Sequence, residues 1–189
     1  TADKSNEITA VPQLLKELKI KGTVITLDAL CTQKDIAEII HHSKADYVLP
    51  LKKNHEKLYD SVKLYLNDPE KLKGIPFCEQ PYNGHGRKET RRHWICTNLK
   101  ELDGADKWAG LKTIGKVERT RELTTGKTKG KISKETCYYI CSIEPDAEFF
   151  AECIRSHWGV ENMVHWTLDA TFREDSCQVR QKTAATNLS

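Results

Sequence analysis

Residues 23–28 read Thr23-Val24-Ile25-Thr26-Leu27-Asp28, an apolar and β-branched run that ends in an acid. Residues of this kind are typical of a buried strand, so the run predicts a strand with Asp28 at its carboxyl end. Ligands of open α/β sheets bind at that edge, which makes Asp28 a candidate functional residue. An aspartate in an Asx turn or a helix cap is the commoner explanation of an acid at this position.

Helices and a second strand are expected on either side of this run. Helical spacing of apolar residues predicts helices over 9–19 and 33–43, the second capped by Thr32. Residues 46–51 predict a second short strand, and a helix capped by Asn54 follows it. The order helix, strand, helix, strand, helix predicts an α/β layer with parallel strands.

The chain changes character after this layer, where proline and glycine become frequent. Three strand-like runs follow, at 87–97, 112–121 and 135–143, with a polar turn at 124–131 between the last two. They predict an antiparallel β insertion or a continuation of the sheet. A helix is then expected over 146–170, with Asp146 as its cap.

The composition indicates a soluble globular protein. The 189 residues include 30 Lys and Arg and 27 Asp and Glu, which gives a net charge of +3. This balance excludes a polybasic tail and an acidic disordered chain. No apolar run approaches the ~18 to 20 residues of a membrane span, and no signal peptide is recognisable, so we expect no membrane partner.

The seven cysteines indicate free thiols. Their number is odd and none forms a C-x-x-C pair, which argues against a zinc ribbon or knuckle. Buried thiols in a reducing cytoplasm are the better explanation, and we therefore expect a cytoplasmic protein.

Ionisable residues recur at every fourth position near the end of the chain. These are His157, Glu161, His165 and Asp169. On a helix they form one stripe among aromatic residues, where charges are costly unless they are paired or bind a cation. A buried, hydrogen-bonded histidine network with a structural purpose is the competing explanation.

A single zinc ion does not fit this stripe. His157 and His165 are eight residues apart, which is about 12 Å along a helix at about 1.5 Å per residue. A hard cation held by two distant carboxylates, Asp28 and Glu161, suits Mg²⁺ or Mn²⁺ better.

Basic residues cluster in the strand-like runs. Arg87 and Arg91 alternate with Glu89 along one run, and Arg119 and Arg121 alternate along the next. Alternate residues of a strand share a face, and such surfaces bind phosphate backbones. Solubilising charges on edge strands are the simpler explanation.

Four motifs together resemble the H-repeat-associated transposases, a branch of the bacterial DDE transposases of insertion sequences. They are VITLDALCTQ at 24–33, DYVLPLKKN at 46–54, HGRKETR at 85–91, and the block that begins with HWGVEN at 157 and ends with Glu174 and Asp175. The similarity covers nearly the whole chain, and the order and spacing of the motifs make it specific.

The resemblance implies an α/β fold with a ribonuclease H-like core and a β-rich insertion before the helix that carries the last acid. Residues 1–73 would be the first part of the core, 74–143 the insertion or continuation, and 144–189 the C-terminal helical part of the core. The first strands of the core would lie upstream, and we expect this chain to be a fragment.

The resemblance also implies metal-dependent DNA strand cleavage and strand transfer. Three acids of the family bind two divalent ions, Mg²⁺ or Mn²⁺. Asp28 would be the second acid and Glu161 the third, with Asp169 or Glu174 as alternatives to Glu161. The first acid would lie upstream, so we expect the isolated fragment to be inactive.

Other residues are expected to support the acids or to bind DNA. His157, Asn162, His165 and Asp169 would support the acids. The residues expected to contact DNA are Lys52, Asn54, Arg87, Arg91, Arg119 and Arg121. The implied partners are the ends of the element, the target DNA and a second copy in a homodimer, with the protein at the bacterial nucleoid.

Two other functions fit parts of the sequence. A DNA-binding relic of a decayed element would bind DNA with a steep salt dependence but would not cleave it. A structural or protein-interaction domain would use the histidine-tryptophan helix only as core, but this function leaves the four-motif match unexplained.

Overall fold

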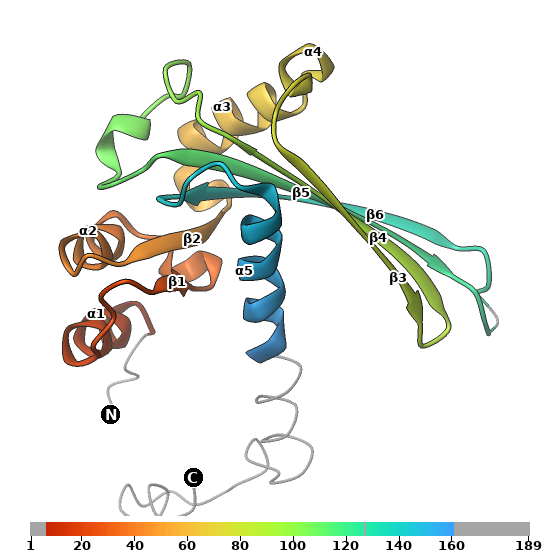
Figure 1. Ribbon diagram of the computed structural model, residues 1–189, viewed down its shortest axis with the longest axis horizontal. Helices are drawn as coiled ribbons and strands as arrows, with labels where there is room; N and C mark the ends of the chain where they lie inside the picture. Colours follow the sequence, from red (N-terminus) through yellow and green to blue (C-terminus); the bar gives the residue numbers. More distant parts are fainter. Residues whose placement is uncertain (1–6, 127, 161–189) are drawn as a thin grey trace, which may run out of the picture. The chain divides into compact units, whose positions relative to one another are not determined.

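The computed structural model describes residues 7–126 and 128–160, and the chain is mixed α/β over this part (Figure 1). The sheet has six strands in the order β1-β2-β6-β5-β4-β3. The strands are β1 (Val24–Thr26), β2 (Asp46–Leu51), β3 (Phe77–Gly84), β4 (Arg87–Cys96), β5 (Thr113–Leu123) and β6 (Ile132–Cys141). The α-helices are α1 (Glu7–Glu17), α2 (Lys34–His42), α3 (Glu56–Leu66), α4 (Pro69–Leu72) and α5 (Ala147–Val160).

The first two strands form the predicted parallel layer. Ile25 of β1 is opposite Tyr47 of β2, and both strands run in the same direction. Residues 29–31, 53–55 and 105–107 form short 3-10 turns in the connections. Ile36 and Ile40 of α2 are fully buried, as the helical spacing predicts. The order of helices and strands expected for residues 9–66 is therefore confirmed.

The remaining four strands form an antiparallel meander. β3 pairs with β4, β4 with β5, and β5 with β6. β6 then pairs antiparallel to β2, with Leu51 opposite Tyr138, so the meander continues the sheet of β1 and β2. The sheet is consequently mixed. The boundaries expected at residues 73 and 143 stay predictions.

β3 is a strand that the sequence did not predict. Most of its side chains are exposed, and Pro81 interrupts the apolar pattern. A proline cannot donate a ladder hydrogen bond and is tolerated at a sheet edge, which is where β3 lies.

Two of the predicted helix caps are wrong. Gln33 rather than Thr32 precedes α2, and His55 rather than Asn54 precedes α3. Neither helix has a side-chain cap hydrogen bond at that position. Asp146 is confirmed as a cap, because its Oδ1 accepts hydrogen bonds from the Glu148 and Phe149 N–H groups at 2.9 and 3.0 Å.

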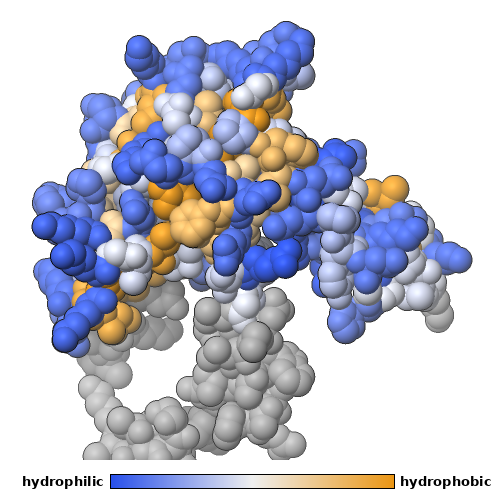
Figure 2. All heavy atoms as spheres, viewed as in Figure 1, coloured by the Kyte–Doolittle hydropathy of each residue, from blue (hydrophilic) through white to orange (hydrophobic). Residues whose placement is uncertain are grey.

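The meander extends past the end of β2. β2 ends opposite Tyr138, whereas β6 already begins at Ile132. The outer parts of β3–β6 therefore lie beyond the carboxyl end of β2, as Figure 1 shows. Figure 2 shows mostly hydrophilic residues over these outer parts, on the right of the view.

The first half of α5 covers one face of the sheet, which we call the α5 face. The Phe150 ring lies edge-on to the rings of His93 and Tyr139, with centroids 6.2 and 5.5 Å away. Gly115 of β5 makes room for this ring, because a Cβ there would lie 2.3 Å from Phe150 Cζ. Residues 154–160 continue the helix.

Two expectations from composition can be checked on the described residues. None of their helices has the length and apolar character that crossing a membrane requires. The six cysteines among them are free thiols, as expected.

Candidate functional site

Asp28 lies where the sequence predicts it, two residues after the end of β1. Its backbone carbonyl accepts a hydrogen bond from the Cys31 N–H at 3.0 Å, which starts the following 3-10 turn. Its exposed side chain makes no capping hydrogen bond to this turn. A cap is therefore not what the Asp28 carboxylate provides.

The loop after Asp28 is tied to the loop after β2. The Asn54 side-chain amide donates to the Ala29 carbonyl at 3.1 Å. The His55 ring Nε2 donates to the Thr32 carbonyl at 2.6 Å, and the Thr32 hydroxyl donates to the Pro50 carbonyl at 2.8 Å. These three bonds fix the position of the backbone that carries Asp28.

The α5 face also includes the Asp28 side of β1. The register aligns Thr26 with Val48, and Val48 with Cys141 of β6, which lies two residues from Tyr139 on the same face. Leu27 packs against the core on the other face, so alternation returns Asp28 to the α5 face.

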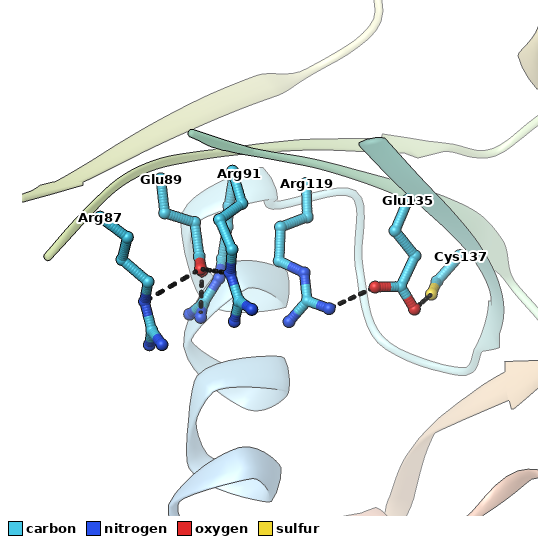
Figure 3. Close-up of polar contacts among 7 residues, drawn as sticks. Arg87, Glu89, Arg91, Arg119, Glu135 and Cys137 are labelled. Carbon is cyan, nitrogen blue, oxygen red and sulfur yellow. Dashed lines mark hydrogen bonds and ion pairs between the residues drawn. The ribbon is translucent and has the colours of Figure 1, made fainter. Parts of the chain in front are cut away.

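Four arginines gather farther out on this face, from two neighbouring strands. Register places Arg91 opposite Arg119, and Glu89 opposite Arg121. Arg87 shares the face because it is two residues from Glu89. Figure 3 shows the labelled side chains pointing to one side of the sheet.

Glu89 lies at the centre of these arginines, and its side chain is only 1 % exposed. Arg91 Nη2 lies 2.5 Å from Glu89 Oε1. Arg121 Nε donates to Glu89 Oε2 at 3.4 Å, and Arg87 Nε lies 3.7 Å from the same oxygen. One buried carboxylate is thus shared by three guanidinium groups.

The pKa of Glu89 reflects this environment. Burial alone would raise the pKa, because it penalises the charged form. The charge and the hydrogen bond of Arg91, together with Arg119 and Arg121, outweigh burial and lower the pKa of Glu89 below its ordinary value. Glu89 is consequently an anion at neutral pH.

The fourth arginine has a different carboxylate partner. Arg119 Nη2 donates to Glu135 of β6 (Figure 3). The adjacent Cys137 thiol has a raised pKa, because of burial and the nearby Glu135 charge. This thiol is therefore not an activated nucleophile.

A cleft of about 420 Å³ lies beside the end of β2, where β6 continues past it. Its lining includes Lys52 and Lys53 from the loop after β2, and Glu135 and Cys137 from β6. The cleft therefore lies at the carboxyl end of β2.

Basic residues on the opposite face have structural partners. Arg92 Nε donates to Glu79 at 2.7 Å. The buried Lys116 ammonium donates to the carbonyl of Leu66, the last residue of α3, and lies 2.6 Å from Glu118. The basic residues of the sequence therefore divide between the two faces.

Several predicted site residues cannot be placed. His157 lies on α5, as predicted. Glu161, Asn162, His165, Asp169 and Glu174 lie outside the described residues. Over residues 7–126 and 128–160, no group of three or more His, Cys, Asp or Glu side chains could hold a metal ion.

The central place of Glu89 was not predicted from the sequence. Its alternation with Arg87 and Arg91 placed the three side chains on one face, but gave no sign that the carboxylate is buried. The pattern that could have indicated it is an acid with arginines two residues before and two residues after it, because all three side chains then share one face of a strand.

Comparison with known proteins identifies the family. The model of the transposase DDE domain matches residues 1–188, and the chain belongs to this family. It is 40% identical over 191 residues to "H repeat-associated putative transposase YhhI" of Escherichia coli K12, covering 98% of this chain and 49% of that protein. It is 41% identical over 188 residues to "Putative transposase YncI" of Escherichia coli O157:H7, covering 98% of this chain and 47% of that protein.

The chain spans about half the length of these curated relatives. No solved structure matches it. These matches confirm the predicted resemblance to H-repeat-associated transposases, and membership of the DDE family implies a ribonuclease H-like fold.

Proposed function

We propose that this chain is the part of a DDE transposase that binds the DNA backbone and supplies two of the acids for strand cleavage and strand transfer. The observation that carries the proposal is that Asp28 and the arginines around Glu89 share the α5 face. In this proposal β3–β6 are the β-rich insertion that precedes the helix with the last acid.

Asp28 suits the chemistry of a divalent metal site. Its carboxylate is exposed and offers the hard oxygen ligands that Mg²⁺ and Mn²⁺ prefer. Asp28 and Glu161 would hold the metal, and His157, Asn162, His165 and Asp169 would orient Glu161. When bound, such ions activate the attacking oxygen and stabilise the leaving oxygen of a phosphodiester.

The chain's own contribution to the reaction is to position the DNA. Each guanidinium group has five N–H donors in a planar fork that matches phosphate oxygens. Arg87, Arg91, Arg119 and Arg121 would hold the backbone beyond the carboxyl ends of β1 and β2. Lys52 and Asn54 would contact DNA closer to Asp28, with Asn54 also holding the loop through Ala29.

The acids can be tested in a cleavage assay. The resemblance places the first acid upstream, so the assay uses a protein that continues this chain in that direction, with Mg²⁺ and DNA that carries the ends of the element. Asp28→Asn and Glu161→Gln should each abolish cleavage without loss of DNA binding. Asp60→Asn, an exposed acid on α3, is the control and should cleave normally.

Two results would contradict this assignment. Full cleavage by Asp28→Asn would remove Asp28 from the site, and full cleavage by Glu161→Gln would move the third acid to Asp169 or Glu174. DNA binding without cleavage by the unaltered protein, in Mg²⁺ and in Mn²⁺, would favour the DNA-binding relic. A homodimer on paired DNA ends stays a prediction.

A further inference from the structure

A buried carboxylate, Glu89, lies within a surface that we propose binds an anion. Glu89 carries a negative charge in the middle of the arginines, where it opposes the attraction of phosphate. If the surface bound DNA by net charge alone, removal of the Glu89 charge would strengthen DNA binding. The position of Glu89 therefore calls for a different role.

The positions of the three arginines around Glu89 indicate what this role is. The side chains of Arg87, Arg91 and Arg121 are 33, 30 and 35 % exposed, so their outer N–H groups reach solvent while their inner ones face Glu89. One carboxylate cannot occupy the fifteen or so N–H donors of three guanidinium groups. Most of the donors remain available to another anion.

Without Glu89 the arginines would repel each other. Arg121 is opposite Glu89, so it is the diagonal neighbour of both Arg87 and Arg91, at about 7 to 8 Å and within reach of long side chains. Like charges at this distance would spread the long side chains into many rotamers. A central carboxylate offsets the repulsion and restricts the rotamers before any ligand arrives.

We propose that Glu89 is the positioning residue of this surface: its buried carboxylate holds Arg87, Arg91 and Arg121 in a fixed fan that binds phosphates of one DNA strand. This inference rests on the proposed DNA-binding function. It adds that the arginines act as a preorganised unit, whose affinity depends on an acid that never touches the DNA.

The isosteric variant Glu89→Gln separates the two roles, because they predict opposite signs. If Glu89 were only an opposing charge, Glu89→Gln would bind duplex DNA more tightly. If it positions the arginines, Glu89→Gln should bind about tenfold more weakly, the loss expected for one charge-assisted hydrogen bond to phosphate. The measurement is fluorescence anisotropy of a labelled mixed-sequence duplex with the full 189-residue chain, at several salt concentrations.

Glu135→Gln is the matched control. Glu135 lies on the same face and is bound to Arg119, but its side chain is 51 % exposed. Because it pairs with one arginine rather than three, its variant should bind as well as the unaltered protein or better. Equal weakening by Glu135→Gln and Glu89→Gln would overturn the special place of Glu89.

A second variant tests the same inference if Glu89→Gln does not fold. Arg91→Lys keeps the charge but loses the planar fork that reaches Glu89 and a phosphate together. It should also bind about tenfold more weakly. Unchanged affinity of Arg91→Lys, or of a folded Glu89→Gln, would overturn the inference.

The failure of the inference differs from the failure of the proposed function. If the unaltered chain does not bind the duplex, both are wrong. If it binds, and Arg91→Gln weakens binding while Glu89→Gln does not, the DNA surface stands and only the positioning role is lost.

Discussion

The buried carboxylate of Glu89 should make the stability of the folded chain depend on pH. Its pKa is lower in the folded protein than its ordinary value, because the arginine charges outweigh burial. A carboxyl group of this kind stabilises the fold at neutral pH, and the contribution is lost as the pH falls through the lowered pKa. The loss therefore begins as the pH falls into the ordinary glutamate range, where the unfolded chain takes up the proton, and it is complete only below the lowered pKa of the folded protein.

Urea unfolding of the unaltered chain and of Glu89→Gln, between about pH 7 and about pH 3, measures this contribution. At neutral pH the free energy of unfolding of the variant should be lower by about 2 to 3 kcal/mol. Removing one partner of a fully buried ion pair costs about 3 to 5 kcal/mol, and the expected loss is smaller because the arginines remain partly exposed. The difference should shrink on acidification. A difference that stays constant with pH would show that the charge of Glu89 is not what stabilises the sheet.

Single residues also show what local sequence patterns can predict and what they cannot. The strand and the terminal acid at 23–28 were predicted from the apolar and β-branched residues of that run, and Asp28 lies where expected. The environment of Glu89 was not predictable in that way. It depends on the register between β4 and β5, which brings Arg121 opposite Glu89 from 32 residues away.

Among the elements, α5 offers a simple test because Glu161 directly follows it in the sequence. Asp146 caps its N-terminus by accepting two backbone N–H groups. Asp146→Ala should destabilise the chain by about 1 kcal/mol, whereas Asp146→Asn should keep most of the stability, since asparagine caps helices about equally well. Thermal unfolding followed by circular dichroism compares them, and equal losses in the two variants would argue against a capping role.

The wrong predictions for elements share a physical cause. Thr32 and Asn54 have side chains suited to capping, but they bind carbonyls 18 and 25 residues distant instead. β3 was missed because an exposed edge strand with a proline lacks the apolar alternation of a half-buried strand. Tertiary contacts decide such cases, and local patterns do not record them.

At the scale of the whole molecule, the extension of the sheet past β2 joins the two parts of the proposed site. β1 and β2 present Asp28 and the loop with Lys52 at their carboxyl ends. β4 and β5 continue beyond that edge and carry the arginines on the same face. The sequence predicted both groups of residues, but their common face depends on the pairing of β6 with β2, which no local pattern indicates.

The central claim is that the α5 face of the sheet binds DNA, and adjacent arginines of β4 test it most directly. Arg91 points to the α5 face and Arg92 to the other, and each is paired with a carboxylate. Duplex binding by the 189-residue chain is measured against salt concentration for Arg91→Gln and Arg92→Gln. Arg91→Gln should weaken binding about tenfold and lower the salt slope by about one, while Arg92→Gln should leave both unchanged. Equal effects of the two variants, or a larger effect of Arg92→Gln, would contradict the account.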